Sequence, residues 1–307
     1  MEIVQVLLKQ CLIMLMLIIT GYILYRKKLV TDAGSRELSN ILVRIIIPCV
    51  IINAYLSADF SMKRVKGLAI MTGLSLLALV IAMIVSYLIF GKRKRVENFS
   101  AAFCNAGFMG IPLVSATLGT EAVFYVAVFV ALLNIFQWTY GLVIMTGNRK
   151  FISPRKIITN PVVIGFVIAI AGFLIPVHIP ALITIPVSYV GAMNTPVAMI
   201  VLGVYLAQTD MRQILKNSSV WWCSIVRLVI IPAITIAVMM LIPLTKEHML
   251  IKQTALIAAV TPVGSNVAIF AKLYGTDYEQ SVRVVCLSTI LCIVTMPCMM
   301  YIANTCL

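Results

Sequence analysis

The sequence predicts an all-α integral membrane protein with ten transmembrane helices, arranged as two inverted five-helix repeats with broken crossover helices 4 and 9. The chain is 62% hydrophobic and only 11% charged, whereas a soluble domain carries about 25% charged residues. Apolar runs long enough to cross a bilayer recur along its whole length. Two of these runs, one in each half of the chain, are interrupted by polar and helix-breaking residues.

The first half of the chain holds five apolar segments separated by short polar connectors. The first segment lacks a basic leader and a small-residue cleavage site, so we expect a retained helix rather than a signal peptide. The second segment is interrupted by Pro48, and the fourth is the first of the two broken segments. The five segments cover residues 3–25, 38–56, 67–90, 99–118 and 122–146.

The second half repeats this pattern. Pro196 lies in its second segment, as Pro48 does in the first half, and the fourth segment is again broken. The connectors stay short, so we expect one membrane domain and no soluble domain. The five segments cover residues 161–176, 184–207, 220–243, 250–271 and 281–303.

The two broken segments contain the candidate site. Proline removes a backbone donor and clashes with the carbonyl four residues before it, so Pro262 should free the carbonyl of Ala258. Unpaired backbone groups cost several kcal/mol in hydrocarbon, so such breaks persist only where protein or a water-filled cavity satisfies them. Broken helices at corresponding places in two halves indicate the central site of a secondary transporter.

Two further features support inverted repeats. The run Leu118-Gly119-Thr120-Glu121, which follows the first broken segment, has the counterpart Tyr274-Gly275-Thr276-Asp277 after the second. Each half holds an odd number of segments, so the second copy is inverted in the membrane. We therefore assign residues 1–150 to the first repeat and 151–307 to the second.

The distribution of Lys and Arg predicts the orientation. Connectors after the odd-numbered segments hold 15 of these residues and the alternate connectors hold 5. The positive-inside rule places the richer set in the cytoplasm, so both termini should be extracytoplasmic at a bacterial inner membrane. The formal charge of +14 then reflects topology and attraction to the inner leaflet, and we expect no nucleic-acid partner.

The broken segments resemble motifs of a known family. The run Asn105-Ala-Gly-Phe-Met-Gly-Ile-Pro-Leu113 is similar to the fourth-helix motif of the auxin efflux carrier family, and Pro262-Val-Gly-Ser-Asn-Val-Ala-Ile-Phe-Ala-Lys-Leu-Tyr274 is similar to its ninth-helix motif. This family includes the plant PIN auxin exporters and many bacterial carboxylate carriers. The chain lacks the long cytoplasmic loop of the plant exporters and so resembles the bacterial branch. The resemblance implies ten helices, a scaffold part, a transport part with crossed helices 4 and 9, and an elevator-like movement.

Crossed half-helices would place free N–H groups and positive dipole ends beside a cavity, which suits an anion. The resemblance implies that Asn105 faces substrate and that Asn134 falls where the plant exporters carry a substrate-facing Gln. The alternative is that these polar groups only cap the broken helices; Asn53 and Asn194 are further candidates. The predicted substrate-binding residues are Asn105, Gly107, Gly110, Pro112, Asn134, Gln137, Thr261, Pro262, Gly264, Ser265 and Asn266.

These observations favour a secondary transporter, for efflux or bidirectional movement, of small organic carboxylate anions such as auxin-like acids or dicarboxylates. No carboxylate lies well inside an apolar segment, which favours movement of the anion without a protonatable side chain. The alternatives are a sodium- or proton-coupled symporter of organic acids and a ligand-binding membrane sensor.

Other sequence features carry no chemistry of their own. No catalytic motif such as H-E-x-x-H or G-x-S-x-G occurs, so we expect no enzyme. The eight cysteines show no metal-like pairing and should be free thiols; no metal or cofactor is expected. Arg44, Arg227 and Arg283 should snorkel to the interface or pair within the protein. The alternative is attraction of the carboxylate substrate, for which Arg44, one turn before Pro48, is the first candidate. The expected partners are the organic anion and the lipid bilayer, with a homodimer left open.

Overall fold

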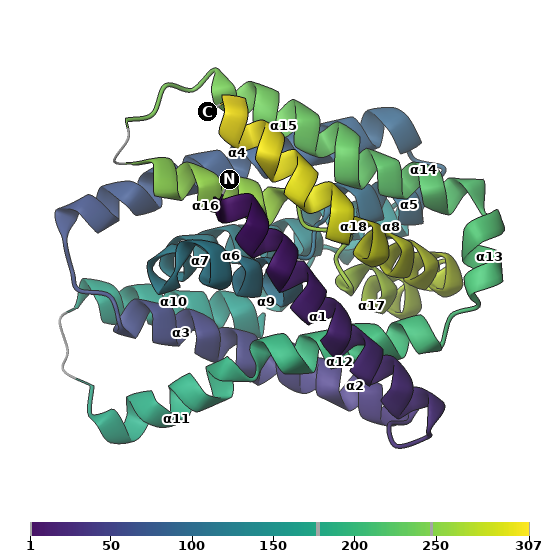
Figure 1. Cartoon of the computed structure of the whole chain (residues 1–307), viewed down its shortest axis with the longest axis horizontal. Coiled ribbons are helices and arrows are strands. Elements are labelled where there is room, and N and C mark those ends of the chain that lie inside the picture. Colours follow the sequence, from purple (N-terminus) through teal and green to yellow (C-terminus); the bar gives the residue numbers. More distant parts are fainter. Residues whose placement is uncertain (1, 176–178, 246–247, 307) are drawn as a thin grey trace.

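The protein is built from helices joined by short loops (Figure 1). The computed structural model describes residues 2–175, 179–245 and 248–306, and these residues form no β-sheet. The helices of the first half are α1 (Glu2–Arg26), α2 (Asp32–Ile41), α3 (Ile47–Leu56), α4 (Met62–Phe90), α5 (Arg95–Ala102), α6 (Ile111–Leu118), α7 (Thr120–Phe136) and α8 (Leu142–Thr146). Those of the second half are α9 (Pro154–Ile158), α10 (Pro161–Leu174), α11 (Ala181–Ala192), α12 (Asn194–Ala207), α13 (Met211–Lys216), α14 (Ser218–Ile225), α15 (Ile231–Met240), α16 (Met249–Ala259), α17 (Asn266–Leu273) and α18 (Tyr278–Cys306).

The expected all-α membrane fold is confirmed. Within the described ranges, seven helices are long and apolar enough to cross a bilayer, rather than the ten expected: Val4–Arg26, Asp32–Leu56, Met62–Phe90, Thr120–Thr146, Ala181–Ala207, Ser218–Met240 and Tyr278–Thr305. The other three predicted segments contain the shorter apolar helices Ala106–Leu118, Pro161–Leu174 and Met249–Ala259. Two of these are short because the chain breaks there, as the sequence predicted. Residue 176, at the end of the segment 161–176, lies outside the described residues, as do residues 1 and 307 at the ends of the assigned repeats.

Wide π turns precede three prolines. The turns η1 (Leu42–Ile46), η2 (Ala106–Gly110) and η5 (Val226–Ile230) each end two residues before a proline. These are Pro48, Pro112 and Pro232, each in the first turn of the helix that follows. A wider turn moves the preceding carbonyls away from the proline ring, so the helix bends and continues. A fourth π turn, η3 (Gln137–Gly141), has no proline after it.

The helices pack as two groups. In one, α1 lies against α12, and α3 lies against α10 and α11. In the other, α4 lies against α5, α7 and α16, and α18 lies against α14 and α17. The groups meet where α1 contacts α6 and α18 and where α7 contacts α3 and α10. Figure 1 shows α3, α10 and α11 in the lower half of the view and α4, α15 and α16 in the upper half.

Helices α1 and α12 touch through their backbones. A Cβ atom on Gly203 would lie 2.0 Å from the carbonyl oxygen of Ile18, and one on Gly21 would lie 2.2 Å from that of Ile200. Only glycine leaves room for so close a crossing. This contact fixes α1 and α12 against each other.

Candidate functional site

The two broken segments cross and satisfy each other's backbone. The N–H of Asn105 donates to the carbonyl of Pro262 at 2.8 Å, and the N–H of Gly264 donates to the carbonyl of Phe103 at 3.0 Å. These bonds form a short antiparallel bridge between the α5–η2 break and the α16–α17 break. The breaks therefore persist because protein groups pair with them, as the sequence required.

The three glycines of the crossover differ in how strictly they are needed. A Cβ on Gly264 would lie 2.8 Å from the carbonyl oxygen of Cys104, so a larger residue would push the two breaks apart. A Cβ on Gly107 would lie 3.4 Å from the nearest side-chain atom of Ile47, and one on Gly110 would lie 3.4 Å from Thr261. The expected close approach therefore depends on Gly264, while the other two positions are tight but not blocked.

Thr261 stabilises the break in the second segment by a hydrogen bond to the backbone. Its side chain is fully buried, and its hydroxyl donates to the carbonyl of Ala258 at 2.8 Å. This is the carbonyl that Pro262 was predicted to free, so the neighbouring threonine replaces the missing donor. Thr261 and Pro262 do not line the crossover cavity; they shape the break beside it.

Arg227 reaches the crossover from η5. Its side chain is 1% exposed, and its guanidinium donates to the carbonyls of Thr261 at 3.1 Å, Ala101 at 3.2 Å and Ala259. Of the two roles expected for this arginine, pairing within the protein is therefore the one observed. Arg283 pairs with Glu279 at 2.6 Å, whereas Arg44 is exposed.

A small cavity lies beside the crossing, bordered by η1, η2, α7 and the start of α17. Its volume is about 20 Å³, which is room for about one water molecule. Six of the predicted site residues line it: Asn105, Gly107, Asn134, Gly264, Ser265 and Asn266. Asn105 is 4% exposed and its Nδ2 atom has no hydrogen-bond partner among the described residues. The cavity therefore contains a buried donor without an acceptor.

The side-chain amides of Asn134 and Asn266, which also line this cavity, are hydrogen-bonded. The Nδ2 of Asn134 donates to the carbonyl of Val130 at 2.9 Å, and its Oδ1 accepts from Asn160 at 3.5 Å. Gln137 does not border the cavity; its Oε1 accepts from the Nδ2 of Asn266 at 2.8 Å. These amides hold each other in place across α7, η3, α10 and α17.

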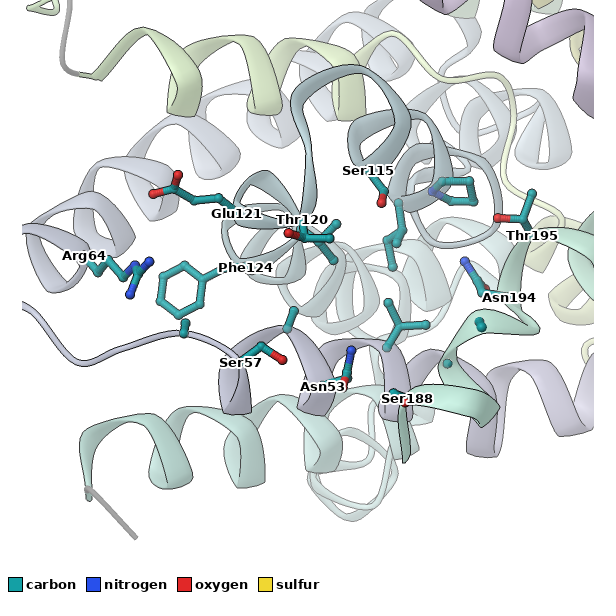
Figure 2. Close-up of a pocket in the computed structure, with 18 residues that line it drawn as sticks. Asn53, Ser57, Arg64, Ser115, Thr120, Glu121, Phe124, Ser188, Asn194 and Thr195 are labelled. Carbon is teal, nitrogen blue, oxygen red and sulfur yellow. The ribbon is translucent and has the colours of Figure 1, made fainter. Parts of the chain in front are cut away.

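A larger cavity of about 430 Å³ lies between α3, α6, α7, α11 and the start of α12 (Figure 2). Pro112 lines this cavity and not the crossover cavity. Figure 2 shows Arg64 and Glu121 at one end and Asn194 at the other. The Nδ2 of Asn194 donates to the carbonyl of Gly107 at 3.5 Å, and its Oδ1 has no partner among the described residues. The deep end of this cavity therefore adjoins the crossover.

A third cavity, of about 530 Å³, lies between α2, the end of α12, α17 and the start of α18. Its lining includes the charged residues Asp32, Arg36 and Lys272. Asp32 accepts hydrogen bonds from the hydroxyl of Tyr25 and from Gln208, both at 2.8 Å. The two large cavities use helices at corresponding places in the two halves of the chain, α3, α6 and α7 in one and α12, α17 and α18 in the other.

Three contributors to the site were not predicted as such. Arg227 was expected to snorkel or to pair within the protein but was given no place in the site, and neither Asn160 nor Ser288 was among the predicted site residues. The Oγ of Ser288 accepts from the N–H of Val263 at 3.2 Å, inside the second break. The signal for Asn160 was the Asn-Pro pair that opens α10, where its Oδ1 caps the helix. No local pattern marks Ser288, because its partner lies on another segment.

Comparison with known proteins identifies a family of membrane transport proteins. A family model described as "Membrane transport protein" matches residues 6–152 and 147–300. The chain is also similar to a protein of Rhizobium meliloti (strain 1021) named "Putative malonate transporter". The two are 22% identical over 253 residues, which cover 77% of each chain.

Proposed function

The chain belongs to the membrane transport protein family, and from that premise we propose that it is a secondary transporter of small organic carboxylate anions. It is a transporter and not an enzyme, as both the family and the named relative indicate. The substrate class, the direction of movement (efflux or bidirectional) and the alternating-access mechanism are parts of this proposal.

The observation that carries the proposal is Asn105, which lines the crossover cavity and whose buried Nδ2 has no hydrogen-bond partner among the described residues. A buried donor without a partner costs about 1–3 kcal/mol, and a carboxylate oxygen would supply the missing acceptor. The helices η2–α6 and α17 begin at this cavity, and neither has a side-chain cap hydrogen bond at its first residue. Their N-termini carry positive partial charge, and no carboxylate lines the cavity. These features favour an anion.

We further propose ten membrane crossings in two inverted repeats, residues 1–150 and 151–307. In this arrangement α5–α6 and α16–α17 form the fourth and ninth crossings, each broken at its centre. The corresponding positions of the two large cavities support the repeat, since a two-fold axis in the membrane plane would exchange them. The Lys and Arg distribution supports extracytoplasmic termini, with the 430 Å³ cavity on the outer side.

The two helix groups suggest how the site changes sides. The group of α1, α3, α10, α11 and α12 would act as scaffold, and the group that holds the crossover would move against it. Both large cavities border the boundary between the groups. A shift along this boundary would join the crossover cavity to one large cavity at a time, as alternating access requires.

Malonate is the first substrate to test, because the name of the Rhizobium relative specifies it. Purified protein in liposomes preloaded with unlabelled malonate should accumulate labelled malonate, and the rate should saturate. A panel of mono- and dicarboxylates as competitors would rank the substrates. Saturable counterflow distinguishes a carrier from a channel; absence of counterflow and of competition for every carboxylate would contradict the proposal.

The main alternative is a symporter in which a sodium ion or a proton accompanies the anion. The carbonyl of Ala258, a candidate ligand for such an ion, is already hydrogen-bonded to Thr261. An imposed sodium or proton gradient that drives malonate accumulation when the membrane potential is clamped would favour the symporter.

A further inference from the structure

Arg227 is a buried cation at the crossover, and the proposed transport function does not by itself explain why it lies there. Its guanidinium is buried and donates to three carbonyls, those of Ala101, Ala259 and Thr261. No carboxylate pairs with it among the described residues. A buried cation is costly unless it is paired and hydrogen-bonded, so the compensating negative charge must come from the backbone.

The three carbonyls belong to the negative ends of two half-helices. Ala101 is the penultimate residue of α5, Ala259 is the last residue of α16, and Thr261 follows in the same break. A helix C-terminus carries about −0.5 elementary charge. One guanidinium therefore offsets the two C-termini that meet at the crossing.

The positive ends at the same crossing have no such counter-charge. The helices η2–α6 and α17 start within a few residues of these carbonyls, after Asn105 and Ser265. The lining of the cavity between them contains no Asp or Glu. Arg227 offsets the negative C-termini of α5 and α16, and no carboxylate in the lining offsets the positive N-termini of η2–α6 and α17. The electrostatic potential in the cavity is therefore positive.

We propose that Arg227 sets the anion preference of the crossover by cancelling the negative ends of α5 and α16. This inference rests on the proposed function, and it assigns Arg227 as a positioning residue that acts through the field without touching the substrate. The planar fork of arginine suits it to three carbonyls that lie in different directions, whereas lysine would keep the charge with a less fixed geometry.

The test compares malonate with its monoamide, at an alkaline pH where the first carries two negative charges and the second one. The electrostatic part of the binding energy is proportional to the charge of the ligand, so its loss should affect malonate more than the monoamide. In Arg227→Gln the half-saturation concentration should rise for both compounds, and the rise for malonate should be about tenfold larger. Arg227→Lys should restore part of this difference. Arg283→Gln, which removes an arginine paired with Glu279 away from the crossover, should leave both values unchanged.

A second pair of variants serves if Arg227→Gln does not fold. Cys223 is buried one helical turn before Arg227, so Cys223→Asp would neutralise the guanidinium while leaving its three carbonyl contacts. Cys223→Asn is the neutral control of the same shape. Only the Asp variant should lose the preference for malonate over the monoamide.

The outcomes separate the two proposals. Equal losses for malonate and the monoamide in Arg227→Gln, or equal behaviour of Cys223→Asp and Cys223→Asn, would show that Arg227 only holds the structure together. A wild-type protein that transports none of the mono- and dicarboxylates of the panel would overturn the proposed function and this inference with it.

Discussion

Replacing Asn105 with alanine should abolish much of the substrate affinity without destabilising the protein. The Nδ2 of Asn105 is buried and has no partner among the described residues. A buried unsatisfied donor costs about 1–3 kcal/mol, and its removal offsets the contacts that the side chain loses. A hydrogen bond to a charged group contributes about 1.5–3 kcal/mol, so the affinity for a carboxylate should fall about 10- to 150-fold.

Asn266→Ala is the informative comparison, because the two asparagines line the same cavity. The Nδ2 of Asn266 donates to the Oε1 of Gln137 at 2.8 Å, and Gln137 is 1% exposed. Its removal leaves a buried acceptor without a partner, which costs about 1–3 kcal/mol of stability. Asn266→Ala should therefore lower both transport and the melting temperature, while Asn105→Ala lowers transport alone.

Both variants can be measured in one experiment. Thermal unfolding in detergent gives the melting temperature, and counterflow of labelled malonate at equal protein density gives the half-saturation concentration. If Asn105→Ala transports as well as the wild type, the free Nδ2 does not bind substrate. If it loses as much thermal stability as Asn266→Ala, the side chain of Asn105 has a structural role instead of binding substrate.

Three further predictions address packing, orientation and energetics. Gly203→Ala should destabilise the protein by about 1–3 kcal/mol in thermal unfolding, because its Cβ would lie 2.0 Å from the carbonyl oxygen of Ile18, whereas Gly73→Ala, with open space around it, should not. A reporter that is active only in the cytoplasm, fused after Leu307, should be inactive in intact cells; activity there would contradict the predicted orientation of the chain. Malonate flux in liposomes should respond to an imposed membrane potential, which supplies about 2.3 kcal/mol per elementary charge per 100 mV; flux that follows only a pH or sodium gradient would contradict uncoupled anion movement.

The all-α fold and the two helix breaks could be predicted from the sequence because they follow from local chemistry, whereas the crossing of the broken segments was implied by the family resemblance. Apolar runs have to span hydrocarbon, and Pro262 removes a backbone donor from any helix that contains it, while Gly264 weakens the helix and permits close approach. The rule that buried backbone must find partners required only that protein groups or a water-filled cavity satisfy each break. The bond from the N–H of Asn105 to the carbonyl of Pro262 is the observed form of that requirement.

The direction in which each side chain points could not be predicted in the same way. A π turn adds a residue to a helical turn, so the residues after it change face; Pro112, which follows η2, lines the 430 Å³ cavity rather than the crossover cavity. Gln137 begins such a turn and binds Asn266 instead of lining the cavity. The contacts of Arg227 could not be predicted for another reason, because its three acceptors lie on segments more than thirty positions away in sequence.

The polar contacts between the two helix groups bear on the proposed movement. Asn160 donates to Asn134, and Asn194 donates to the carbonyl of Gly107, each across the boundary and each at 3.5 Å. Hydrogen bonds of this length are weak, whereas those within the crossover are shorter, at 2.8 Å and 3.0 Å. A boundary that has to slide needs contacts that break at little cost, and a crossover that carries the substrate has to stay intact. The longer hydrogen bonds at the boundary and the shorter ones within the crossover therefore fit a movement in which the crossover shifts as a rigid unit.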